Sequence, residues 1–197
     1  MTPPVYGSRA ALKLRLAIPA DDDTADALLD SALSASSRGI EKSTGRRFWL
    51  DPTPVQRLYR TAGRIVRKAD GDLLLVDDIG DVGGLVVETG SGTSWSAITG
   101  YETQPDNAIA DGRPVTGLLR TSGSWATARV RVTTRFGWPA EPEDVTEAAL
   151  IQATRLYKRK DSPEGIIGSA EWGVRNLSRR DPDVWALIEP YILPGFG

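Results

Sequence analysis

The stretch "VTTRFGWPAEPEDVTEAALIQATRLYKRKDSPEGIIGSAEWG", residues 132–173, contains an abrupt change of hydrophobic periodicity. Up to Phe136, apolar and polar residues alternate, as in a strand with one buried face. After Pro142, apolar residues recur every three or four positions, and Glu143 and Asp144 place negative charge in the first turn, as in a helix. The stretch therefore predicts a strand, an aromatic turn, a helix, and then a loop that contains Trp172.

Two helices are predicted before this stretch. Ser8 is placed to cap the first, in "RAALKLRLAI", and Pro19 ends it. The second lies within residues 20–48, where apolar residues follow the i, i+3, i+4, i+7 pattern. The aspartates at 21–23 are expected to supply its cap and a favourable charge at its N-terminus, and Gly45 is expected to end it.

Residues 50–136 have a different pattern, because turn residues divide short β-rich runs. The predicted strands are "VQRLYRT", "RIVRKA", "DLLLVDD", "GLVVET", "SWSAIT", "GLLRTS" and "ARVRVTTRF". In the last of these, the arginines are expected to form a solvated basic face. The sequences "DGD", "GSG", "SGS" and "GDVGG" are predicted to be hairpin turns.

A final helix is predicted in "DPDVWALIEPY", with Asp181 as its cap and Pro182 at its first position. The apolar segment "YILPGFG" follows. The elements together predict an α+β fold with a discontinuous helical core, residues 1–49 plus 137–197. An antiparallel β-sheet or sandwich, residues 50–136, is inserted between its two parts.

Composition restricts the chemistry that the chain can perform. The 197 residues include no cysteine and no histidine, which excludes disulfides, thiol nucleophiles and imidazole bases. The net charge of −2 gives no reason to expect tight, nonspecific binding to nucleic acid. No apolar run has the roughly 18–20 residues of a membrane span, and the first residues lack the apolar core of a secretory signal. We expect no cofactor, no metal and no membrane partner.

Carboxylates are the remaining candidates for catalysis or metal binding. The aspartates at 21–23 could bind a divalent cation, although a helix cap is the favoured interpretation. An acid pair could exist among five residues at strand edges or turns: Asp77, Asp78, Asp81, Glu88 and Glu102. Two alternatives to a structural role therefore stay open. One is a carboxylate-dependent hydrolase in the β region, and the other is a carbohydrate- or peptide-binding β module.

Two other features point to partner proteins. The sequences "RLYKRK" and "VRNLSRR" gather cations that form solvated faces, pair with acids on a neighbour or face DNA. Trp172 lies in a polar segment and Phe196 lies beside glycine. Aromatic side chains on such segments are typical of contacts with partners, although packing against the chain's own core is an equal alternative for Trp172.

The order of these elements resembles the head-to-tail adaptor (connector) proteins of long-tailed double-stranded DNA phages and related gene-transfer particles. The similarity includes "ALLDSALSASSRGIEKSTGRRF", with its Ile40–Glu41 pair and its Gly45-Arg46-x-Phe48 end. It continues in "VRVTTRFGWPAEPEDVTEAAL", which is similar to the family pattern V-x-G-x-x-G-[WY]-x-x-[VI]-P, with Arg135 where a glycine is expected. It ends in "AEWGVRNLSRRDPDVWALIEPY". The inserted β region resembles the family least.

The resemblance implies a structural virion protein without enzymatic activity, located in the head-tail neck and made in the host bacterial cytoplasm. Such proteins form a ring, usually dodecameric, between the portal protein and the head-closure (stopper) or tail-terminator protein. The ring extends the channel through which double-stranded DNA passes. The implied portal or subunit interface comprises Trp172, Arg175, Arg179, Arg180, Trp185, Tyr191, Ile192, Leu193 and Phe196. The implied channel-facing or inter-subunit cations are Arg155, Lys158, Arg159 and Lys160.

Overall fold

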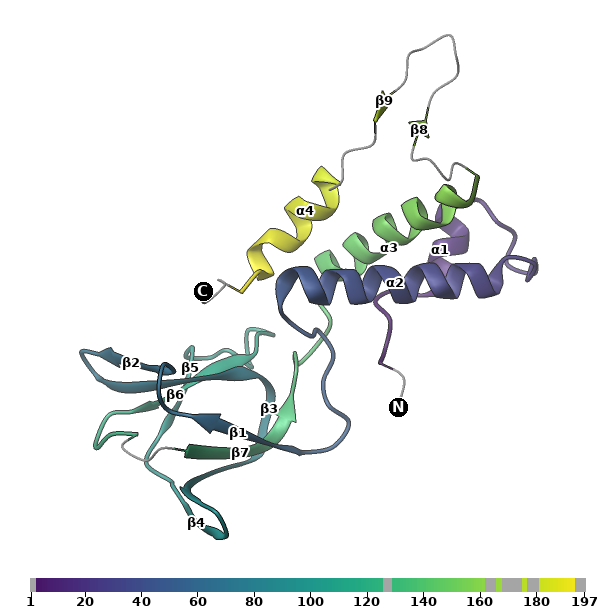
Figure 1. The fold of residues 1–197 in the computed structure, drawn as a ribbon. Coiled ribbons are helices and arrows are strands. Elements are labelled where there is room, and N and C mark those ends of the chain that lie inside the picture. The colour runs from purple at the N-terminus through teal and green to yellow at the C-terminus, as the bar shows by residue number, and fades with distance from the viewer. Residues whose placement is uncertain (1–2, 126–128, 162–165, 168–174, 177–180, 194–197) are drawn as a thin grey trace. The chain divides into compact units, whose positions relative to one another are not determined.

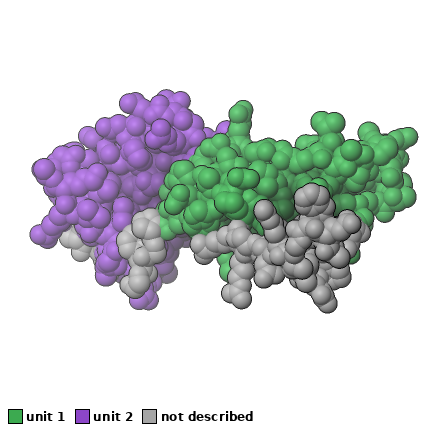
Figure 2. Space-filling model, turned by 90° about the horizontal axis from the view of Figure 1, so that it is seen from above, with its two compact units in different colours: residues 1–46, 141–197 green, residues 47–140 purple. Residues whose placement is uncertain are grey.

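The computed structural model describes residues 3–125, 129–161, 166–167, 175–176 and 181–193 (Figure 1). The chain divides into two compact units, shown in Figure 2. Unit 1 comprises residues 1–46 and 141–197, and unit 2 comprises residues 47–140. The described residues form helices and a seven-stranded antiparallel sheet, which confirms the predicted α+β class.

Unit 1 is helical. Its helices are α1 (Arg9–Arg15), α2 (Asp26–Thr44), α3 (Glu143–Lys158) and α4 (Pro182–Ile188). Short 3-10 turns, η1 (Arg159–Asp161) and η2 (Glu189–Tyr191), follow α3 and α4, and β8 (Ile166–Ile167) pairs with β9 (Arg175–Asn176). Figure 1 shows α2 and α3 side by side. Their contact encloses a core of buried apolar side chains that includes Leu12, Leu29, Leu33, Leu150 and Ala153.

The helix ends follow local chemistry, with two corrections. The first helix ends at Arg15, before the predicted break at Pro19, and Ala17 already has a left-handed backbone with φ 55°. Ser8 caps α1 as predicted, because its Oγ accepts a hydrogen bond from the amide of Ala11. Gly45 ends α2 in the left-handed conformation, φ 69°, also as predicted. The prediction that the aspartates at 21–23 cap α2 is wrong, because the helix begins at Asp26 and has no side-chain cap. Asp22 instead accepts hydrogen bonds from the amide and hydroxyl of Thr24 within the preceding loop.

Unit 2 consists of the strands β1 (Val55–Arg60), β2 (Ile65–Lys68), β3 (Gly71–Ser91), β4 (Ser94–Ala97), β5 (Glu102–Gln104), β6 (Val115–Arg120) and β7 (Arg129–Phe136). The antiparallel order is β1-β7-β3-β6-β5, and β2 and β4 also pair with β3. The core between them contains Leu74, Ile79, Leu118, Trp125 and Phe136. Trp125 is buried, and its indole N–H is satisfied there by the carbonyl of Asp72 at 2.9 Å.

Strand β3 corrects the sequence prediction. The runs "DLLLVDD" and "GLVVET" were expected to be two strands joined by a "GDVGG" hairpin turn, but one strand spans both. Its first half pairs with β6 and its second half with β7, and the register shifts between Ile79 and Val86 mark an irregularity in the ladder. From Asp81 to Val86 the strand advances five residues while β7 advances two, from Arg135 to Thr133, so the glycines lie in a bulged, irregular part of one strand. The short strand β5 was not predicted.

Strand β7 alternates as predicted, with Val130, Val132 and Thr134 buried. Its outward arginines do not form a simple solvated face. Arg131 makes two hydrogen bonds to Glu88, at 2.6 and 2.7 Å, and Arg135 pairs with Asp81 at 3.3 Å. Both acids come from β3, so these pairs join neighbouring strands.

Candidate assembly surface

The start of α4 is fixed to α3 through Asp181. One carboxylate oxygen of Asp181 accepts hydrogen bonds from the amides of Asp183 and Val184, which satisfies two open donors of the helix. The other oxygen lies 3.0 Å from the guanidinium of Arg155 on α3. The side chains of Arg155 and Asp181 are only 19% and 17% exposed, so this ion pair is well shielded from water.

The residues after α4 are held by backbone hydrogen bonds at the C-terminal end of α2. The amide of Leu193 donates to the carbonyl of Thr44 at 2.9 Å, and the Arg46 guanidinium donates to the carbonyl of Tyr191 at 2.8 Å. The Tyr191 hydroxyl donates to Asp144 on α3 at 3.2 Å. The last described residues are therefore positioned by both long helices.

A groove of about 160 Å³ lies between α2, α3 and α4. Ile40, Val184 and Ile188 are buried in its walls, while Trp185 is half-buried. Gly39 leaves open space, because a Cβ atom built there would meet no heavy atom within 4 Å. The full lining comprises Ala35, Ser36, Gly39, Ile40, Ser43, Gln152, Asp181, Val184, Trp185 and Ile188.

A second apolar feature lies on α1. Leu14 is 83% exposed, more than any other large apolar side chain in the described part of the chain. It lines a hollow of about 370 Å³ together with Ala10 and Ile18. The exposure of Leu14 could not be predicted from the sequence, because the contacts of α1 with α2 and α3 decide which of its sides is buried.

Some of the predicted interface residues lie in or after α4. Trp185 lines the groove, Ile192 is half-buried, and Leu193 is 41% exposed. Trp172, Arg179, Arg180 and Phe196 lie outside the described residues. The backbone of Arg175 belongs to β9, but its side chain is not among those described.

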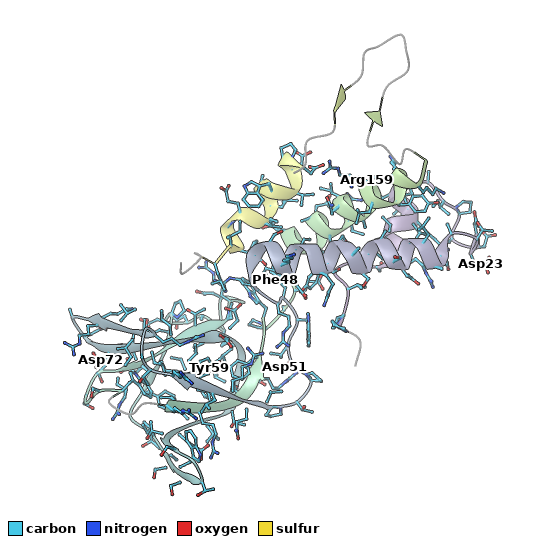
Figure 3. All side chains as sticks on the ribbon, in the orientation of Figure 1. Asp23, Phe48, Asp51, Tyr59, Asp72 and Arg159 are labelled. Carbon is cyan, nitrogen blue, oxygen red and sulfur yellow. The ribbon has the colours of Figure 1, made fainter. Side chains whose placement is uncertain are left out.

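The predicted cations at the end of α3 divide into two kinds. Arg155 forms an ion pair with Asp181 of the same chain. Lys158, Arg159 and Lys160 are exposed, and Figure 3 shows Arg159 where α3 ends. The Lys160 ammonium donates to the Tyr157 hydroxyl at 2.9 Å and lies 4.3 Å from the centre of its ring. Ala35, Gly39 and Ser43 were not predicted as site residues, although their spacing of four along α2 places these small residues on one side of the helix.

The carboxylates of β3 in unit 2 have structural partners. Asp77 pairs with Arg57 at 2.8 Å, and Asp78 accepts a hydrogen bond from the indole of Trp138 at 3.1 Å. The hydrogen bonds from Arg131 hold the pKa of Glu88 below its ordinary value. A general acid requires the opposite shift of its pKa.

Among the described residues, no group of three or more acidic side chains is placed to hold a metal ion. Within the same residues, no helix is long and apolar enough to span a membrane.

Comparison with known proteins shows a likeness of fold to a solved structure. No protein-family model and no curated protein matches the chain. A solved structure described as "Neck of empty GTA particle computed with C6 symmetry" contains a chain of similar fold, where GTA denotes a gene transfer agent. The TM-score is 0.56 and the sequence identity is 21%, over 100% of this chain and 95% of that chain. The similarity shows that the two chains share a fold over nearly their whole lengths.

Proposed function

We propose that this chain is a structural neck protein of a phage or phage-like particle. In this proposal, copies of the chain form a ring between the portal and the head-closure or tail-terminator protein, and DNA passes through the ring. The observation that carries the proposal is the fold shared with a chain of a GTA neck, since both chains match over nearly their full length. The order of sequence motifs supports the same role independently.

The C6 symmetry of that neck suits a cyclic assembly, and the proposed ring is a dodecamer, which is compatible with sixfold symmetry. We assign portal docking to η2 and the residues that follow it, through Phe196. The hydrogen bonds of Tyr191 and Leu193 hold the start of this segment in a fixed position on unit 1. The exposed cations Lys158, Arg159 and Lys160 then face a neighbouring subunit or the channel.

The proposal is tested with purified protein and portal-bearing heads that lack tails. The protein is examined by light scattering and negative-stain imaging, alone and after mixing with the heads. Rings in solution, or a new ring on each portal vertex, are the expected result. A monomer that leaves the portal vertices unchanged would contradict the proposal. Heads that lack the portal are the control for nonspecific adsorption.

A further inference from the structure

We propose that adjacent copies of this chain join head to tail in unit 1, with Leu14 of one copy inserted into the α2–α4 groove of the next. This inference rests on the proposed function, because it names the contact from which the ring is built. The occupant of the groove is thus a second copy of the chain.

Leu14 has the properties of an inserted side chain. At 83% exposure it leaves almost all of its apolar surface in water, and Ala10 and Ile18 extend the apolar area around it. Arg9 and Arg15 lie on the same short helix and are bonded to Asp30 and Glu147. These pairs fix the helix on the surface of unit 1. Burial of an exposed leucine is a substantial source of association energy.

The groove has the size and lining for such a side chain. Its volume of about 160 Å³ is close to the roughly 150 Å³ of an apolar protein cavity that accepts a benzene molecule. Ile40, Val184 and Ile188 provide apolar walls, and the open position above Gly39 lets another helix approach closely. One aliphatic side chain fits this space.

The cations of α1 are paired within their own copy. Arg9 and Lys13 bind Asp26, and Arg15 binds Glu147. The contact that we propose is therefore apolar, and insertion of Leu14 leaves these ion pairs in place.

The two features lie on opposite sides of α2, so one copy cannot satisfy both. Arg9 on α1 contacts Asp26 and Asp30, whereas the groove is lined by Ala35 and Gly39. Asp26 and Ala35 are nine residues apart, and so are Asp30 and Gly39. Nine residues are about two and a half helical turns, which places the two members of each pair on opposite sides of α2. Each copy thus offers an insertion on one side and a groove on the other. Repeated contacts between different surfaces generate a ring when the rotation closes.

Disulfide trapping tests the inference directly, because the natural chain has no cysteine. The double variant Leu14→Cys/Gly39→Cys is oxidised under conditions in which imaging shows rings, in solution or on portals, and is then separated without reductant. We expect a ladder of covalent multimers that ends at the ring. Each single variant should give nothing larger than a dimer. Leu28→Cys/Gly39→Cys is the matched control, since Leu28 is also an exposed leucine, and it should give no ladder.

A substitution provides the second measurement. Leu14→Ser should raise the protein concentration needed for ring assembly by about tenfold or more, while Leu28→Ser leaves it unchanged. Rings without the ladder and with no effect of Leu14→Ser would overturn the inference and leave the proposed function intact. A disulfide within one copy would also overturn it. If imaging shows no ring under any condition, the proposed function fails and the inference fails with it.

Discussion

Lys13 is the residue that ties the first helix of unit 1 to the loop before the second. Its side chain is only 8% exposed, and its ammonium lies 2.6 Å from a carboxylate oxygen of Asp26. The same ammonium donates to the backbone carbonyls of Asp22 and Ala20, at 2.7 and 3.3 Å. The buried charge is thus fully surrounded by acceptors, and its removal leaves Asp26 without its closest cation.

We therefore expect Lys13→Met to lower the free energy of unfolding by about 3 kcal/mol, in the range for breaking a buried ion pair. Lys42→Met, at an exposed position of α2, is the control and should change it by less than about 0.5 kcal/mol. Urea denaturation followed by circular dichroism measures both. Equal effects of the two substitutions would show that the Lys13 contacts contribute little.

The Glu88–Arg131 pair predicts a pH dependence in unit 2. The hydrogen bonds from Arg131 lower the pKa of Glu88 from its ordinary 4.5, so the folded state binds the proton less readily than the unfolded state. The stabilisation is therefore complete above about pH 4.5 and is lost as the pH falls through the lowered pKa. Glu88→Gln should give a smaller loss of stability between pH 5 and 3, in roughly the range where carboxylates protonate.

Urea midpoints at a series of pH values measure this effect. The control is Glu102→Gln, because Glu102 is an exposed carboxylate on β5. It should keep the pH profile of the natural chain. Identical profiles for all three proteins would mean that the Glu88 pair makes no difference to stability at acidic pH.

At the scale of elements, Asp181 joins two roles that a substitution can separate. It caps α4 and also holds Arg155. Asp181→Ala removes both contacts, and we expect it to cost about 2 kcal/mol, since the loss of a cap alone costs about 1 kcal/mol. Asp181→Asn keeps a capping oxygen but removes the charge, so its effect should be smaller.

Hydrogen exchange at the amides of α4 is the direct measurement for both variants. Exchange should be fastest in Asp181→Ala and intermediate in Asp181→Asn. If exchange in α4 is the same in all three proteins, then packing against α2 and α3 holds the helix and the cap does not.

The elements also show how far sequence reasoning reaches. The first residues of α1 and α4 were predictable, because the caps Ser8 and Asp181 are local signals that need no tertiary contact. The continuity of β3 was not, because glycines produce the same signal in a turn and in a bulge. The groove could not be predicted from the sequence, because it depends on how α2, α3 and α4 pack and no local pattern encodes that packing.

At the scale of the whole molecule, portal docking is assigned to the C-terminal segment. Deletion of residues 191–197 removes that segment together with the bonds of Tyr191 and Leu193 to the helical unit. We expect the shortened chain to keep its helices and its sheet but to fail to join a portal. Particle yield in a complementation assay measures the effect, and circular dichroism checks the fold.

A deletion of residues 194–197 alone is the matched comparison, because it keeps every described contact of Tyr191 and Leu193. If it fails in the same way, the residues from 194 onward carry the docking contact. Normal particle yield from the longer deletion would contradict the assignment of portal docking to this segment.

The most direct measurement of the central claim is the mass of the assembly on isolated portals. Native mass spectrometry of the portal, with and without this 21.3 kDa chain, counts the bound copies. The account predicts that the added mass corresponds to a closed ring whose copy number is compatible with sixfold symmetry, the dodecamer being the expected form. A portal whose mass is unchanged, beside a chain that remains a monomer, would contradict the account.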